Sequence, residues 1–172
     1  MIGTGASAIQ IVPSVANEVR RLSVFQRNAA WVLPKFNRQF TDDEHRRWAT
    51  SPWRQRLRRL KVYWFMEMAL PALLWFPKLL GLAEFVHKWR LKRTIKDPVL
   101  RRKLTPDYRI GCKRSLVSDT YLKTFCRENV ELVTDGIERI VPEGIRTKDG
   151  VTHPLDILIY ATGYAAGAPA FP

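Results

Sequence analysis

The order of hydrophobic and polar positions divides the chain into three segments, at residues 1–40, 41–104 and 105–172. The first segment opens with the glycine-rich stretch 3–8, continues through helix-competent residues 8–19 and then reaches the apolar run 22–25. This order predicts a turn, a helix and a strand.

The third segment contains short apolar runs separated by turn residues. Four of these runs predict strands, at residues 130–133, 137–141, 145–147 and 156–161. The last run is continuously apolar, which is typical of a strand covered on both faces. Ser118 is the expected cap of a short helix over residues 119–126. Together with the first segment, these elements predict one α/β sheet.

The middle segment shows a helical period instead. Apolar residues recur at steps of three or four, which predicts helices with one apolar face each. The first face consists of Trp53, Leu57, Leu60, Trp64 and Met68, and the second of Leu79, Leu82, Val86 and Trp89. Asp97 and Pro98 predict the N-cap and first residue of a further helix that ends near Leu104. We interpret the segment as an α-helical insertion into the sheet domain.

Positive charge is concentrated in the middle of the chain. Its 172 residues include 29 Lys and Arg against 16 Asp and Glu, for a formal net charge of +13. Nineteen of the basic residues but only four of the acids lie between Arg46 and Arg114. Such an excess predicts a partner, a surface or further protein of opposite charge. The apolar share of 46% indicates a folded protein and not a disordered tail.

Metal and disulfide chemistry is not expected. Cys112 and Cys126 form no C-x-x-C pair, and the three histidines are scattered along the chain. No secretory signal opens the sequence, so the expected setting is reducing and cytoplasmic.

The stretch Gly3-x-Gly5-x-x-Ala8 matches a dinucleotide-binding turn whose third glycine is replaced by alanine. The first glycine permits the tight strand-to-helix turn, and the second lets the backbone approach a pyrophosphate at the helix N-terminus. The acid that usually binds the ribose 2′-hydroxyl is missing, since no Asp or Glu occurs between Glu18 and Asp42. A cation, Arg27, follows the predicted strand instead and suits a 2′-phosphate. The pattern favours NADP over NAD, although an ordinary turn of small residues beside a surface arginine stays open as the alternative.

Four stretches occur in an order that is far more specific than any one of them. They are Gly3–Ala8; Val24-Phe25-Gln26-Arg27 leading to Trp31-Val32-Leu33-Pro34; Thr105-Pro106-Asp107-Tyr108 before Gly111-Cys112-Lys113-Arg114; and Ala161-Thr162-Gly163-Tyr164. This ordered set resembles the class B flavoprotein monooxygenases, and among them the Baeyer–Villiger type. In that family an FAD-binding dinucleotide domain is interrupted by an NADPH-binding one with a helical insertion. The resemblance implies a Rossmann-like NADPH-binding domain at residues 1–40 and 105–172, with the insertion at 41–104.

The same resemblance implies roles for individual residues. NADPH would be bound by Gly3, Thr4, Gly5, Ala6, Ser7 and Ala8, and its 2′-phosphate by Arg27 and Lys113. Ala161, Thr162 and Gly163 would form the link between the two dinucleotide domains, close to cofactor. Arg114 matches the catalytic arginine, which stabilises the negatively charged oxygen adduct of the flavin. Without the family, Lys113 and Arg114 could equally be two members of a basic face.

The implied reaction uses FAD, NADPH and O₂ to insert one oxygen atom into a ketone, or to oxygenate a heteroatom. Two features depart from the family, because the FAD glycine motif and the Phe, Gly, His and Trp signature that precede the NADPH glycines do not occur in this sequence. Asn28 also stands where the family often has a hydroxyl residue. We therefore expect a fragment of a two-dinucleotide-domain flavoprotein, inactive alone, whose partner would be the missing FAD domain.

A second hypothesis, from a different class, is a basic peripheral membrane module without catalysis. Residues 63–82 are mainly apolar, but Glu67, Lys78 and two prolines argue against a membrane span. Attachment to a membrane surface through an amphipathic basic helix is the more plausible form of this hypothesis. Nucleic-acid binding is not expected, because no recognition motif accompanies the basic residues.

Overall fold

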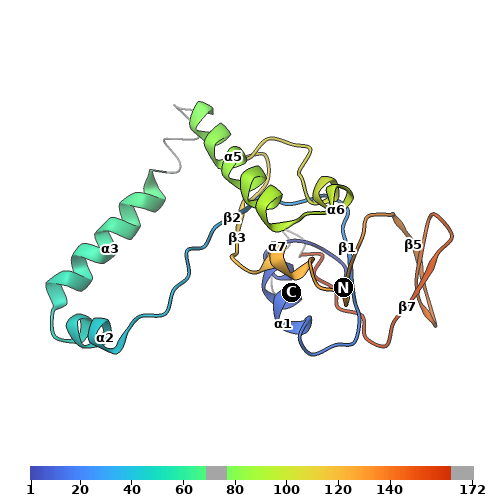
Figure 1. Ribbon diagram of the computed structural model, residues 1–172, viewed down its shortest axis with the longest axis horizontal. Coiled ribbons are helices and arrows are strands. Elements are labelled where there is room, and N and C mark those ends of the chain that lie inside the picture. Colours follow the sequence, from blue (N-terminus) through green and yellow to red (C-terminus); the bar gives the residue numbers. More distant parts are fainter. Residues whose placement is uncertain (69–76, 164–172) are drawn as a thin grey trace, which may run out of the picture.

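The computed structural model describes residues 1–68 and 77–163 (Figure 1). Along the chain the helices and strands are α1 (Ala8–Val15), β1 (Leu22–Phe25), β2 (Val32–Leu33), α2 (Asp42–Ala49), α3 (Pro52–Glu67), α5 (Pro77–Thr94), α6 (Pro98–Lys103), β3 (Leu116–Val117), α7 (Tyr121–Thr124), β4 (Val130–Val133), β5 (Ile137–Val141), β6 (Gly144–Thr147) and β7 (Thr152–Pro154).

Parallel strands form the centre of the fold. β1 pairs with β4 in parallel, so that Val24 lies opposite Leu132. On its other side β1 meets Ile2, which bridges both Phe25 and Tyr160 in parallel. All four residues of β1 are buried, as expected for a strand with neighbours on both sides.

The main core lies between this parallel layer and the helices. One face of α1, formed by Ala8, Val12 and the following Ala16, is almost completely buried. These residues recur every four positions, so α1 presents one continuous apolar face, and it packs against α7. A smaller cluster joins Phe25 and Val133 to Ile145 of the antiparallel sheet β5-β6-β7.

A second parallel pair anchors the helical segment. β2 and β3 pair with Val32 opposite Leu116, and α2, α3, α5 and α6 lie between these two strands in the chain. The C-terminal half of α5 packs onto β2 and α7. It does so through His87, Leu91 and the following Ile95, which are almost completely buried.

The predicted strands over residues 22–25, 130–133 and 137–141 are confirmed, and the predicted helix after Asp97 is α6, whose first amides donate to the Asp97 carboxylate. Two predicted helices are too long. α1 ends at Val15 instead of Val19, because tighter bonds from Asn17 to Ser14 and from Glu18 to Val15 close its last turn. α7 covers only residues 121–124 of the range 119–126, although Ser118 Oγ accepts from the amides of Thr120 and Tyr121 as expected of a cap.

The expectation of a strand at residues 156–161 covered on both faces is wrong. The amide of Ile2 donates to Ile159 O at 2.9 Å, and the amide of Ala161 donates to Ile2 O at 2.8 Å. No longer ladder forms in the described residues, because Ile2 is the single bridging partner. Ile157 is 74% exposed and Tyr160 61%.

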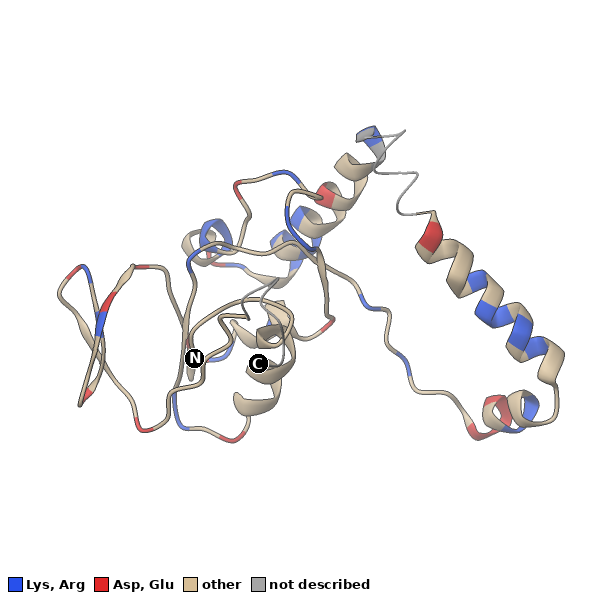
Figure 2. Ribbon diagram, turned by 180° about the vertical axis from the view of Figure 1, so that it is seen from behind, with Lys and Arg blue, Asp and Glu red and all other residues tan. Residues whose placement is uncertain are grey.

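The two helices predicted from the apolar spacing are present as α3 and α5, but their predicted apolar faces are largely exposed. No residue of α3 is buried, and the five residues of its predicted face are between 46% and 62% exposed. On α5, Leu82 and Trp89 are exposed, and the side chain of Leu79 lies outside the described part. The helices α2 and α3 stand apart from the body of the molecule, and the basic residues of α3 lie in its N-terminal part, up to Lys61 (Figures 1 and 2).

Within residues 1–68 and 77–163, no helix is long and apolar enough to cross a membrane. The apolar run at 63–82 includes residues 69–76, which lie outside the described part, as does Tyr164.

Candidate functional site

The turn that follows Ile2 requires glycine at its first position. Gly3 has φ +109°, in the region that residues with a side chain rarely adopt. A Cβ at Gly3 would also collide with the carbonyl oxygen of Ala161. The turn and the Ala161-Thr162-Gly163 stretch therefore lie in direct contact, although more than 150 residues separate them.

The N-terminus of α1 is open for a ligand. Gly5, Ala6 and Ser7 are exposed, and a Cβ placed on Gly5 would meet nothing within 4 Å. The first turn of α1 carries no acidic residue, and Ser7 makes no side-chain cap hydrogen bond. Ala8 is fully buried, which is what close packing of the helix onto the strands demands of the third small residue. This arrangement fits a pyrophosphate at the helix N-terminus.

Arg27 lies in the turn after β1, next to the glycine turn. Thr4 Oγ1 donates to the backbone oxygen of Asn28 at 3.1 Å, which ties the two turns together. The Arg27 side chain is exposed, and no carboxylate within the described part lies at ion-pair distance from it. Its charge is thus available to a ligand beside the glycine turn.

Lys113 and Arg114 lie in the irregular segment that leads into β3. Trp31 holds this segment, since its Nε1–H donates to Tyr108 O at 2.9 Å and its backbone oxygen accepts from the Leu116 amide at 2.8 Å. Lys113 Nζ lies 4.5 Å from the centre of the Tyr108 ring. Both Lys113 and Arg114 are exposed.

The parallel register of β2 and β3 fixes how the segments before these two strands enter the pair. Because Val32 pairs with Leu116, the residues directly before the two strands lie at the same end of the pair. Lys113 lies three residues before β3, whereas Arg27 lies two residues after β1. In the residues that the structure describes, no hydrogen bond joins Arg27, Lys113 or Arg114 to the glycine turn.

Trp31, Gln26 and His87, to which the sequence assigns no role, support the segments around the site by hydrogen bonds and packing. Trp31 and Gln26 occur in the family-like stretches, and Gln26 Nε2 donates to Lys103 O at 2.6 Å, which joins the end of β1 to the end of α6. His87 is fully buried, with Nδ1 3.2 Å from the Val32 amide and its ring 5.0 Å from that of Trp31. Burial lowers the pKa of His87, so it is neutral at pH 7 and supports β2 without adding charge. Only the long-range packing of α5 could reveal this role.

The described part of the chain holds no group of three His, Cys, Asp or Glu side chains that could bind a metal ion. Cys112 and Cys126 are both free and exposed.

Comparison with known proteins adds the family context. No family model matches the chain. A Baeyer–Villiger monooxygenase of Streptomyces coelicolor is 42% identical over 164 residues, covering 95% of this chain and 32% of that protein. Another, from Pseudomonas aeruginosa, is 38% identical over 169 residues, covering 98% of this chain and 32% of that protein.

Comparison with solved structures leads to the same family. A crystal structure of OTEMO in complex with FAD and NADP superimposes with a TM-score of 0.77 at 27% identity, covering 95% of this chain and 37% of that one. The chain thus spans about a third of the length of the curated relatives. In sequence and in fold, it is a relative of the class B flavoprotein monooxygenases of the Baeyer–Villiger type.

Proposed function

We propose that this chain is the NADPH-binding part of an FAD- and NADPH-dependent monooxygenase that inserts one oxygen atom of O₂ into a ketone or oxygenates a heteroatom. The observation that carries the proposal is the glycine turn, where an open helix N-terminus lies beside an unpaired cation, Arg27. In the proposed protein, residues 1–40 and 105–172 form the NADPH-binding domain and residues 41–104 its helical insertion. The FAD domain, largely outside this chain, would be the partner.

Each site residue has a distinct task in this proposal. The backbone of residues 3–8 receives the pyrophosphate, since residues 5–7 are exposed and the helix N-terminus favours an anion. Arg27 and Lys113 bind the 2′-phosphate by charge-assisted hydrogen bonds. Gly3 allows the Ala161-Thr162-Gly163 link to pass close to the nucleotide.

The bound cofactors supply the hydride and the activation of oxygen, for which side chains offer no redox centre. Arg114 would supply a positive charge to the flavin site, where its guanidinium would stabilise negative charge during oxygenation. The positioning of this arginine depends on Trp31, whose hydrogen bond holds the preceding segment at Tyr108.

The proposal is tested on nucleotide binding by the 172-residue chain. In Arg27→Ala, the affinity for NADPH should fall by about 1.5–3 kcal/mol, the range for hydrogen bonds to charged groups, while the affinity for NADH stays nearly unchanged. Titrations followed by nicotinamide fluorescence measure both affinities. Arg21→Ala is the matched control. Arg21 is also an exposed arginine that follows the glycine turn in the sequence, but its Nη2 forms an ion pair with Glu131 Oε2 at 2.7 Å. Equal losses for NADPH and NADH would reject the assignment of Arg27.

A further inference from the structure

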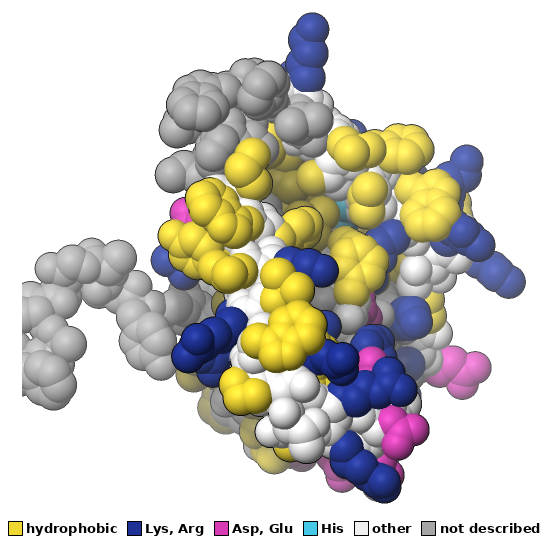
Figure 3. Space-filling model, turned by 90° about the vertical axis from the view of Figure 1, so that its left-hand side faces the viewer, with side chains coloured by type: hydrophobic (Ala, Val, Ile, Leu, Met, Phe, Trp, Pro, Cys, Tyr) yellow, Lys and Arg dark blue, Asp and Glu magenta, His cyan; other side chains and the backbone are white. Residues whose placement is uncertain are grey.

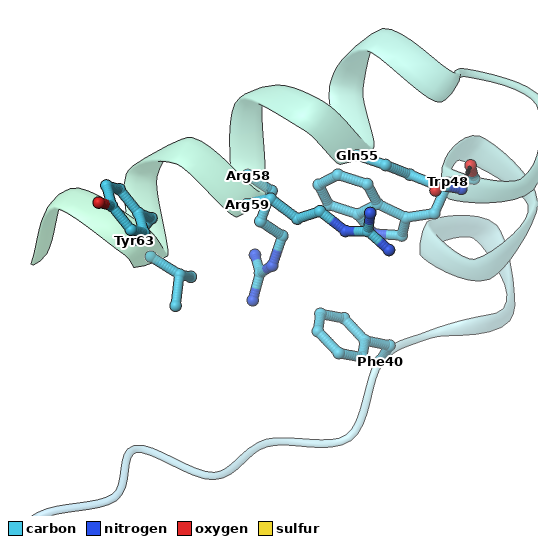
Figure 4. A pocket seen from close by; sticks show the side chains of 7 residues that line it. Phe40, Trp48, Gln55, Arg58, Arg59 and Tyr63 are labelled. Atoms are coloured by element: carbon cyan, nitrogen blue, oxygen red, sulfur yellow. Dashed lines mark hydrogen bonds between the residues drawn. The ribbon is translucent and has the colours of Figure 1, made fainter. Parts of the chain in front are cut away.

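A shallow cavity of about 530 Å³, open to solvent, is lined by Phe40 and by residues of α2 and α3 (Figure 4). These two helices stand apart from α1, where the glycine turn lies (Figure 1). This volume is in the range of small-molecule sites. Its lining consists of Phe40, Trp48, Gln55, Arg58, Arg59, Val62 and Tyr63.

Local hydrogen bonds hold the cavity walls in place. Thr41 and Glu44 form a capping box at the start of α2, and Arg38 donates to Glu44 Oε1 at 2.6 Å. The Arg38 hydrogen bond lowers the pKa of Glu44 to about 2, so this carboxylate stays charged and engaged. Gln55 Nε2 donates to Trp48 O at 2.6 Å, which joins α3 to the end of α2. The cavity is therefore built before any ligand arrives.

Two cations of the cavity, Arg58 and Arg59, have no acidic partner in the part of the chain that the structure describes. The guanidinium carbon of Arg58 lies 5.1 Å from the centre of the Phe40 ring and 5.4 Å from that of Trp48. These contacts place the Arg58 guanidinium beside two aromatic rings, which accept no conventional hydrogen bond, so its N–H groups can still donate to an oxyanion. Arg59 points into the gap between Tyr63 and Phe40 (Figure 4). Across residues 1–68 and 77–163, no carboxylate lies within 4.0 Å of Arg58 or Arg59.

We propose that this cavity binds an amphipathic anion, with its oxyanion head on Arg58 and Arg59 and its aliphatic body against the apolar lining. The head is required because Arg58 and Arg59 both line the cavity without a carboxylate partner among the described residues, and each guanidinium favours a negative charge. The body is required because Phe40, Trp48, Val62 and Tyr63 offer an apolar surface that a hydrated anion alone would not cover. A free carboxylate amphiphile and an anionic lipid share this chemistry.

The first experiment measures the binding of sodium octanoate to the 172-residue chain by calorimetry, with acetate as the head alone and 1-octanol as the body alone. Octanoate should bind roughly ten-fold or more tightly than either, because it satisfies both parts of the cavity. Binding of octanoate no tighter than that of acetate would overturn the proposal.

Arg59→Gln tests whether octanoate binds in the cavity or is attracted by the overall positive charge of α3. Arg56→Gln is the matched control. Both variants remove one positive charge from an exposed position of α3, but Arg56 does not line the cavity. The affinity for octanoate should fall roughly ten-fold or more in Arg59→Gln and by less than about two-fold in Arg56→Gln. Circular dichroism checks that both variants keep their helices. Equal losses in the two variants would overturn the proposal.

Sedimentation with vesicles distinguishes the two sources of the anion. The vesicles contain phosphatidylcholine with a quarter of phosphatidylglycerol. Sedimentation that is lost in Arg59→Gln and kept in Arg56→Gln identifies a lipid headgroup. Octanoate binding without sedimentation identifies a free amphiphile. Sedimentation that falls equally in both variants means that the charge of α3, and not the cavity, attracts the membrane, which contradicts the proposal.

Discussion

Apolar residues are buried in the body of the molecule and exposed on the helix pair α2–α3. In the body, Val12 of α1 and Val24 of β1 are both fully buried. On α3, Trp53 is 62% exposed and Trp64 60%, although their spacing is as regular as that of α1. Hydrophobic and basic side chains share the face of the molecule that Figure 3 shows. Helical periodicity therefore predicts that a helix has an apolar face, but not that the structure covers it.

The contrast follows from what lies next to each element. α1 packs against α7 and the strands, so its apolar face contributes to the main core. The main packing partner of α3 among the described elements is α2, an eight-residue helix without buried residues. Five of the sixteen residues of α3 are Lys or Arg, which remain hydrated beside the apolar ones.

The sharpest test of this comparison uses one substitution in both regions. Leu91→Ala removes a side chain that is 1% exposed and should lower the free energy of unfolding by about 2–5 kcal/mol. Leu60→Ala removes one that is 53% exposed and should change it by less than about 0.5 kcal/mol. Urea denaturation of the two variants measures the difference. Similar losses would mean that the apolar face of α3 is covered in solution.

A smaller effect is expected at the contact between the glycine turn and Ala161. Gly3→Ala should cost about 1–3 kcal/mol of stability, because alanine is strained at a positive φ and its Cβ would displace the Ala161 carbonyl. Gly5→Ala is the control, since its Cβ would meet open space. Thermal melts should show Gly5→Ala close to the parent. If both alanines destabilise equally, the close approach at Gly3 is not the cause.

The smallest effect concerns Asp119, which joins the body to the chain leading into α2. Its Oδ1 and Oδ2 accept from the amides of Lys35 and Asn37, each at 3.0 Å, and Arg90 Nη2 lies 3.6 Å from Oδ1. The hydrogen bond from the Asn37 amide is the main cause of the lowered pKa of Asp119. Asp119→Asn should lower the free energy of unfolding at pH 7 by about 0.5–1.5 kcal/mol.

The pH dependence has a definite sign. Because the pKa of Asp119 is lower in the folded chain than in the unfolded one, the stabilisation is present above about pH 4 and is lost as the pH falls through the native pKa. The difference between Asp119→Asn and the parent should therefore shrink in acid. A difference that is constant from pH 7 to acid would contradict the charge-based explanation.

The sequence predicts the residue types of the candidate site but not the contacts between them. The spacing of Gly3, Gly5 and Ala8 indicates a nucleotide-binding turn, because a small residue is required for steric reasons at each of these positions. The contact of Gly3 with Ala161 and the bond from Trp31 to Tyr108 join residues far apart in the chain. No local pattern encodes such pairs, since they depend on how the strands are ordered.

The sequence by itself determined the strands at residues 22–25, 130–133 and 137–141, because short apolar runs bounded by turn residues have few alternatives. It also determined the N-cap of α6 at Asp97, where the side chain satisfies amides of its own first turn. Tertiary structure alone decided which apolar faces are buried. On α5 the buried residues are His87 and Leu91 and not Leu82 and Trp89, because burial depends on the neighbour that a helix meets as well as on its own periodicity.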